Sequence, residues 1–246
     1  MYRRATSVLL DHTLNMLLEA LREEVLEANL ELQRKGLVVY TFGNVSGISR
    51  DDGLVVIKPS GVPYEHMRAS DLVVTDLDGN VVEGKLRASS DLATHLVLYR
   101  AFKELGGVVH THSTYATAWA QSGREIPCFG TTHADYFHGS IPLTPPLRDD
   151  EIRGDYEANT GKGIVRRFEN LDPMKSPGVL VVGHGPFCWG RTATDAAHMA
   201  VIMEELARMA YLSVSLTPAL PALPAVLHDK HFLRKHGPDA YYGQKK

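Results

Sequence analysis

The sequence is poor in cysteine, since Cys128 and Cys188 are the only two among 246 residues. Two cysteines so far apart indicate neither the disulfide framework of a small secreted domain nor a multi-cysteine metal site. This usage is typical of a protein kept in a reducing cytoplasm, so we expect a cytoplasmic location.

Excess charge and long apolar runs are also missing. The formal net charge is -3, and no cluster of Lys and Arg is interleaved with aromatics, so nothing indicates a nucleic-acid partner. Every apolar run is shorter than the roughly 18 to 20 residues that a membrane span needs. At 44% hydrophobic residues the chain can still bury a full core. We expect one compact domain that binds neither nucleic acid nor a membrane.

Apolar periodicity predicts helices and strands without a regular alternation between them. Helical spacing covers residues 14–35, 91–105, 194–212 and 224–235, and Ser113 or Thr114 can cap a further helix. Short runs rich in β-branched residues, bounded by turn-forming residues, predict strands at 37–40, 54–57, 72–74, 81–82, 108–112, 126–131, 140–143 and 179–182. This order favours a mixed, mostly antiparallel sheet covered by helices.

The strongest local signal for chemistry is the pair His110 and His112 on a predicted strand. Alternate side chains of a strand project to one face, so two imidazoles in this spacing can hold one metal ion. Such a pair is often incidental unless further ligands join it, and two candidates exist. His184 ends a predicted core strand, although a surface-loop histidine is the simpler interpretation. Asp91 starts a predicted helix, where a carboxylate is also favoured by the helix dipole alone.

Three histidines and one carboxylate would suit Zn²⁺ or a similar divalent ion better than Mg²⁺ or Ca²⁺, which prefer oxygen ligands. A second set of residues has the components of an anion site: small residues, hydroxyls, backbone N–H groups and a lysine. Its members are GNVS (43–46), KPSG (58–61) and the serine pair 89–90. None matches the P-loop pattern, and each string alone is more often only a turn.

These strings occur together, in a fixed order, with others along the chain: GNVS (43–46), KPSG (58–61), SSD (89–91), HTH (110–112), GTTHAD (130–135), HGP (184–186), DKH (229–231), KHG (235–237) and YYGQ (241–244). In this order they resemble the zinc-dependent class II aldolase and epimerase family, in its L-ribulose-5-phosphate 4-epimerase branch. The resemblance covers residues 21–244. Residues before Leu18 have no counterpart, Phe42 stands where the family has tryptophan, and Lys245 and Lys246 extend past the usual end.

The resemblance implies a three-layer α/β/α fold with a mixed, mostly antiparallel central sheet. It implies one domain over residues 18–246, after an N-terminal extension of residues 1–17, and a homotetramer with active sites at subunit interfaces. The metal ligands it implies are Asp91, His110, His112 and His184. The implied substrate-binding residues are Gly43, Asn44, Lys58, Ser60, Gly61, Ser89 and Ser90, and the implied catalytic residues are Asp135, Tyr242 and His231.

The activity that the resemblance implies is interconversion of L-ribulose 5-phosphate and D-xylulose 5-phosphate, an isomerase reaction of carbohydrate metabolism at C4. One alternative is a class II aldolase that cleaves a sugar 1-phosphate such as L-fuculose 1-phosphate. Those aldolases carry a glutamate where this chain has Asp91, which favours the epimerase. A second alternative is a non-catalytic zinc-binding domain of the same fold, and the filled ligand positions speak against it.

Overall fold

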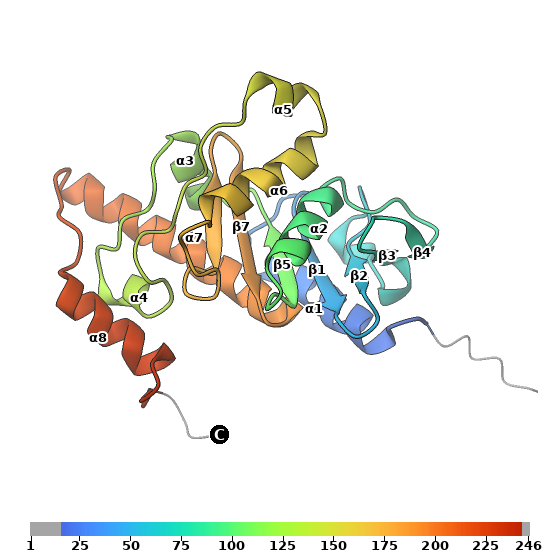
Figure 1. Ribbon diagram of the computed structural model, residues 1–246, viewed down its shortest axis with the longest axis horizontal. Coiled ribbons are helices and arrows are strands. Elements are labelled where there is room, and N and C mark those ends of the chain that lie inside the picture. Colours follow the sequence, from blue (N-terminus) through green and yellow to red (C-terminus); the bar gives the residue numbers. More distant parts are fainter. Residues whose placement is uncertain (1–15, 243–246) are drawn as a thin grey trace, which may run out of the picture.

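The computed structural model describes residues 16–242 (Figure 1). The predicted extension, residues 1–17, therefore lies outside the described residues except for its last two. A seven-stranded sheet runs through the centre in the order β4-β3-β2-β1-β5-β7-β6, and all neighbouring strands pair antiparallel. The strands are β1 (Asn44–Ser49), β2 (Leu54–Ile57), β3 (Val73–Asp76), β4 (Val81–Glu83), β5 (Gly107–His110), β6 (Gly178–Val181) and β7 (Gly185–Gly190).

Helices cover both faces of this sheet. They are α1 (Glu19–Arg34), α2 (Leu92–Ala101), α3 (Thr114–Gln121), α4 (Thr131–Ala134), α5 (Asp149–Arg153), α6 (Tyr156–Arg167), α7 (Ala193–Leu216) and α8 (Ala225–His236), with two short 3₁₀ turns at Tyr64–His66 and Ala69–Asp71. Helices α1, α3 and α7 pack on one face, while α2 and α6 lie together on the other (Figure 1). None of the described helices combines the length and apolar character that a bilayer crossing needs.

Two apolar cores result from the alternation of side chains along the central strands. Val109 faces the α1 and α7 side, and its neighbour Val108 faces the α2 and α6 side. Val56 and Val55 of β2 divide between the two cores in the same way. Because both faces are covered, β2 (LVVI) and β6 (GVLV) are continuous apolar runs. The three-layer fold with an antiparallel sheet that the sequence predicted is confirmed.

A buried amide fixes the start of β1 against α1. Asn29 is fully buried, its Oδ1 accepts from the Val45 backbone N–H at 2.9 Å, and its Nδ2 donates to the Val45 carbonyl at 3.2 Å. Both hydrogen bonds clamp the residue next to Asn44. Displacement of these buried groups is unfavourable, because each donor or acceptor left unpaired in the core would lower the free energy of unfolding by about 1 to 3 kcal/mol.

Three strand predictions were wrong. Residues 37–40 form a turn after α1, in which Tyr40 has a positive φ of 53° and is 85% exposed. The run 126–131 contributes only an isolated bridge from Ile126 to Ile141 and then enters α4, and residues 140–143 form only isolated bridges. The predicted strand 108–112 ends at His110. Short apolar runs form a strand only where a neighbouring backbone is free to pair with them.

Strands β1 and β7 and helices α4, α5 and α6 had no sequence prediction. β1 is rich in Asn, Ser and Gly, and β7 begins with a Gly-Pro pair, so both resemble turns in the sequence. Helices α5 and α6 lie in the segment between the predicted strands at 140–143 and 179–182. Tertiary pairing overrides the weak local preference of β1 and β7, and both strands border the candidate site.

Candidate active site

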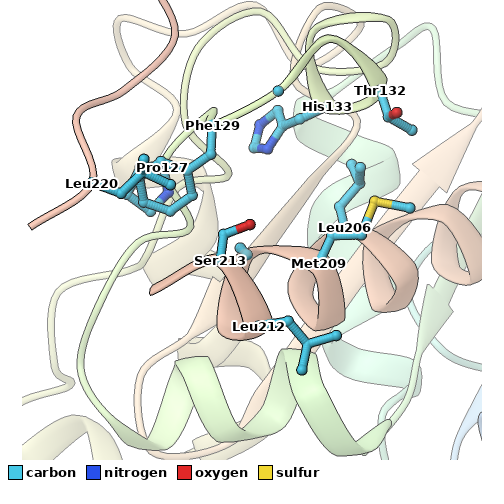
Figure 2. Close-up of a pocket in the computed structure, with 11 residues that line it drawn as sticks. Pro127, Phe129, Thr132, His133, Leu206, Met209, Leu212, Ser213 and Leu220 are labelled. Carbon is cyan, nitrogen blue, oxygen red and sulfur yellow. The ribbon is translucent and has the colours of Figure 1, made fainter. Parts of the chain in front are cut away.

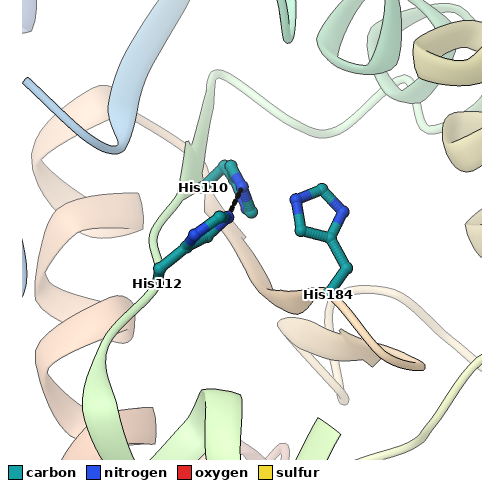
Figure 3. Close-up of side chains that lie close together, drawn as sticks. All are labelled: His110, His112 and His184. Carbon is teal, nitrogen blue, oxygen red and sulfur yellow. Dashed lines mark hydrogen bonds between the residues drawn. The ribbon is translucent and has the colours of Figure 1, made fainter. Parts of the chain in front are cut away.

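Three imidazoles converge beside the end of the interior strand β5 (Figure 3). His110 ends β5, His112 follows it, and His184 lies in the turn between β6 and β7. Because β5 pairs with β7, with His110 opposite Phe187, the end of β5 and this turn meet. The three ring centroids lie 4.7 to 5.0 Å apart, and one nitrogen from each ring lies within 4.8 Å of the others.

The surroundings prepare these rings to bind a cation. His110 Nδ1 lies 3.0 Å from the Pro186 carbonyl, an acceptor that favours a proton on Nδ1 and leaves Nε2 unprotonated. That Nε2 lies 3.0 Å from His112 Nε2. Burial is the main cause of a lowered pKa for both His110 and His184, so both are neutral near pH 7, the form that ligates metal. The donor set fits Zn²⁺ or a similar divalent ion.

Asp91 precedes α2 and lines the same pocket. Its Oδ2 accepts a 2.6 Å hydrogen bond from Asn44 Nδ2. Burial raises the pKa of Asp91, but electrostatic interactions with His110 and His95 and the hydrogen bond from Asn44 outweigh it, so the pKa lies below its usual value and the group stays ionised. Its oxygens are not in the set of mutually close donors that the three histidines form. The structure therefore brings Asp91 to the pocket of the three histidines, with Asn44 as its partner.

The pocket around the histidines contains every residue that the sequence proposed for metal or substrate binding. They are Gly43, Asn44, Lys58, Ser60, Gly61, Ser89, Ser90, Asp91, His110, His112 and His184. They come from segments up to about 140 positions apart, and the sheet brings them to one place. Their grouping makes this pocket the candidate active site.

Lys58 supplies a buried cation to this pocket. Its side chain is 2% exposed, its Nζ donates to the Thr41 and Pro59 carbonyls at 3.3 and 3.4 Å, and it lies 4.8 Å from the Tyr64 ring centroid. Among the described residues no carboxylate pairs with it. Burial lowers the pKa of Lys58 to about 8. An ammonium held without a counter-ion, beside serine hydroxyls, is suited to bind an anion such as a phosphate.

The sequence reasoning missed three residues that line the pocket, namely Thr41, Tyr156 and Glu157. Tyr156 and Glu157 begin α6, and the Tyr156 hydroxyl lies 3.4 Å from His184 Nδ1. The sequence contained one signal for the start of α6, since Asp155 precedes it and aspartate is favoured at the N-cap of a helix.

Behind the pocket, His95 is fully buried, and its Nδ1 lies 2.7 Å from Ser46 Oγ. Burial lowers the pKa of His95 to about 4, so this packed histidine is neutral.

Asp135, His231 and Tyr242 form a separate group. Arg234 donates to both carboxylate oxygens of Asp135 at 3.0 and 2.9 Å, and His231 Nδ1 lies 3.1 Å from Oδ1. The Tyr242 ring stacks over the Arg234 guanidinium at 4.8 Å. None of the three lines the histidine pocket, and α4 and α8, which position them, lie together at one end of the molecule (Figure 1).

The electrostatics of this second group favour an ionised carboxylate. Burial raises the pKa of Asp135, but hydrogen bonds from Arg234 and His231 and the charge of Lys235 outweigh it and hold the pKa below its usual value. The sequence therefore identified two groups of residues, and a single subunit does not bring them to the same pocket.

A further pocket lies between α7 and the chain before α4 (Figure 2). Its walls are mostly apolar, with Phe129, Leu206 and Met209 among them. His133 reaches it, but its Nε2 is engaged with the Gly139 carbonyl at 2.9 Å. The pocket offers no set of converging polar groups for catalysis.

Comparison with known proteins identifies a family and a shared fold. Residues 23–211 match the family model described as the class II aldolase and adducin N-terminal domain. The chain is similar to the solved structure of an L-fuculose 1-phosphate aldolase, with 24% identity, a TM-score of 0.74, and coverage of 88% of this chain and 96% of that one.

It is also similar to YgbL, a putative aldolase/epimerase/decarboxylase, from Escherichia coli and from Klebsiella pneumoniae. The E. coli protein is 26% identical with a TM-score of 0.67, covering 86% of this chain and 97% of that one. The Klebsiella protein is 24% identical with a TM-score of 0.69, covering 87% and 99%.

Replacing His112 tests the metal site. We expect His112→Asn to weaken zinc binding by on the order of tenfold or more, because one of three nitrogen donors is lost. Elemental analysis after dialysis at fixed free zinc measures the effect. His66→Gln, at an exposed histidine outside the pocket, is the control and should retain zinc. Equal zinc content in His112→Asn and wild type would contradict the ligand assignment.

The pKa of Lys58 predicts how anion binding depends on pH. A lysine with a pKa of about 8 is cationic at pH 7 and mostly neutral at pH 9. Sulfate keeps its charge over this range, so its affinity should be about tenfold weaker at pH 9 than at pH 7. Lys58→Met should bind sulfate weakly at both pH values. Calorimetric titration measures this, and a pH-independent affinity in the wild type would show that Lys58 does not hold the anion.

Proposed function

The chain belongs to the class II aldolase and adducin N-terminal domain family, and from this premise we propose that it is a zinc-dependent L-ribulose-5-phosphate 4-epimerase. The main support is that three histidine donors and the buried Lys58, which has no carboxylate partner among the described residues, line one pocket. A metal site and an anion site in one pocket suit a small phosphorylated sugar. The reaction would belong to cytoplasmic pentose metabolism, such as arabinose breakdown.

The chemistry of C4 dictates what the pocket must do. The hydrogen on C4 is not next to the ketone, so it is not acidic, and inversion requires the C3–C4 bond to break. A base takes the proton of the C4 hydroxyl, and the electron pair of the broken bond stays with the C1–C3 fragment. The C4–C5 aldehyde phosphate turns, the bond forms on its opposite face, and an acid returns a proton to the C4 oxygen. The enzyme must therefore retain the aldehyde between the two steps.

The residues of the pocket divide these tasks. Lys58, with Ser60 and Ser89, would hold the phosphate while the aldehyde turns, because charge-assisted hydrogen bonds keep one end of the fragment fixed. His110, His112 and His184 would hold zinc, which supplies Lewis-acid polarisation of the ketose oxygens when bound. Asn44 donates to Asp91 and keeps this carboxylate oriented beside the metal ligands.

Two proton-transfer groups on opposite sides of the aldehyde are required, and we assign them to Asp135 and Tyr242, with His231 beside them. Asp135 is ionised and can accept a proton. Because these residues lie apart from the pocket in one subunit, we propose that they face the histidine pocket of a neighbouring subunit in a homotetramer. Such an arrangement places the active site between subunits.

An aldolase is the second candidate. The similar structure of an L-fuculose 1-phosphate aldolase supports it as well as the epimerase. The shorter Asp91, where the aldolases carry glutamate, favours the epimerase, since a carboxylate one methylene shorter and bonded to Asn44 reaches less far into the pocket. A non-catalytic zinc domain is the third candidate, and it accounts less well for the uncompensated Lys58.

Product analysis tests the proposal and separates the candidates. Zinc-loaded protein incubated with L-ribulose 5-phosphate should accumulate D-xylulose 5-phosphate to equilibrium, with little free glycolaldehyde phosphate, measured by coupled assay or NMR. Free aldehyde as the main product, or cleavage of L-fuculose 1-phosphate alone, would favour the aldolase. No turnover of either sugar, with zinc bound, would favour the non-catalytic domain.

Mixing subunits tests the shared active site. His112→Asn and Tyr242→Phe should each lose most activity, the first with its zinc and the second without zinc loss. After the two variants are unfolded and refolded together, hybrid tetramers should regain part of the wild-type rate, because some interfaces combine an intact pocket with an intact tyrosine. Refolding each variant alone is the control. A mixture no more active than its components would overturn the assignment of Tyr242 to a neighbouring site.

A further inference from the structure

A second set of metal-ligand side chains lies where α8 packs against the loop after α4. His138 comes from the loop, and His228 and Asp229 come from the first turns of α8. One donor atom from each lies within 4.8 Å of the other two. None of the three lines the histidine pocket, and the proposed reaction does not use them.

The distances among these donors suit a tetrahedral metal ion. Asp229 Oδ1 lies 3.2 Å from His138 Nε2 and 3.5 Å from His228 Nδ1. Metal–ligand bonds of about 2.0 to 2.2 Å set neighbouring ligand atoms of a tetrahedral zinc site about 3.3 Å apart. The spacing therefore matches two edges of such a tetrahedron without rearrangement of the backbone.

His228 is held in the orientation that a ligand requires. Its side chain is buried, its ring lies parallel to the buried Phe232 ring at an interplanar angle of 8°, and its Nε2 lies 3.0 Å from the Phe137 carbonyl. A proton on Nε2 donated to this carbonyl leaves Nδ1 unprotonated toward Asp229. A metal-binding histidine characteristically donates its second nitrogen in this way.

The alternative tautomer of His228 accepts the Gly139 backbone N–H at Nε2, also at 3.0 Å, and turns an Nδ1 proton toward Asp229. Both tautomers keep the ring in place. A metal ion at Nδ1 would select the first of them.

The negative charge of the Asp229 carboxylate would favour binding of a cation. Within the described part of the chain, Asp229 has only the two histidines as charge partners and no Lys or Arg. The side chains of His138 and Asp229 are 47% and 53% exposed, so water can complete the coordination shell. The Phe232 ring packs against both imidazoles, with its centroid 4.8 Å from the His138 ring centroid.

The chemistry of the donors indicates which metal would bind. Two imidazoles and one carboxylate favour zinc or a similar borderline divalent ion over Mg²⁺ or Ca²⁺.

We propose that His138, His228 and Asp229 form a second zinc site that ties α8 to the loop after α4. Among the helices and strands of the described chain, α8 packs chiefly on the four-residue helix α4, so it has few other anchors. The same helix carries His231 and Arg234, which bind Asp135. A metal ion at the start of α8 would hold His231 and Arg234 in position against Asp135. Zinc binding at His138, His228 and Asp229 does not depend on epimerase activity.

Calorimetric titration with Zn²⁺ at pH 7.5 tests the site in the full-length protein. Metal-stripped wild type should bind two equivalents per chain, and the double variant His138→Gln, Asp229→Asn should bind one. Both replaced side chains are about half exposed, so the variant should keep the wild-type circular dichroism and melting behaviour. His66→Gln, the loss of an exposed histidine elsewhere, should retain two equivalents. Equal stoichiometry in wild type and double variant, whatever its value, would overturn the proposal.

Hydrogen exchange tests the link to α8. Added Zn²⁺ should slow amide exchange in α8 of the wild type several-fold and leave the double variant unchanged. If zinc binds with two equivalents but α8 exchanges at the same rate with and without it, the site does not tie the helix down. Neither readout uses turnover, so a failure of the epimerase proposal would leave both results interpretable.

Discussion

The candidate site depends on the antiparallel pairing of β5 with β7. This ladder sets His110 opposite Phe187 and brings the turn that carries His184 beside the end of β5. A shift of one residue would turn His110 away to the other face of the sheet, because side chains alternate along a strand. Burial of both faces penalises such a slip, since it would move Val108 and Val109 into the wrong cores. The packing of the apolar core therefore fixes the position of the metal donors.

The same burial tunes the charges in the pocket. Removal from water keeps His110 and His184 neutral and brings the pKa of Lys58 down to about 8. Asp91 remains ionised because its neighbours outweigh the cost of its burial. The result is a pocket with neutral histidines, an ionised Asp91 and a buried lysine that has no carboxylate partner among the described residues. The histidines and Asp91 are complementary to a divalent cation, and Lys58 is complementary to an anionic substrate.

The charge of Asp135, unlike that of Lys58, is paired within the same chain. Arg234 and His231 satisfy its carboxylate within the subunit, and Tyr242 stacks over Arg234. All of these partners come from α8 and the chain just after it, so the position of one peripheral helix decides where the carboxylate and the phenol point. This dependence explains why the attachment of α8, by packing or by a second metal ion, matters to residues that are far from the histidine pocket in the same chain.

The layered fold with an antiparallel sheet, and most of the residues that line the histidine pocket, could be predicted from the sequence alone. The spacing of His110 and His112 predicted that both imidazoles face one side, although the strand ends at His110 and His112 follows it. The remaining features depend on contacts between distant segments. β1 and β7 have turn-like sequences and become strands because β5 offers each of them a backbone to pair with. Tyr156 and Glu157 enter the pocket through the packing of α6, and Asp135 falls outside it through the placement of α4 and α8. Contacts between distant segments depend on the shape of the whole core, which no local pattern encodes.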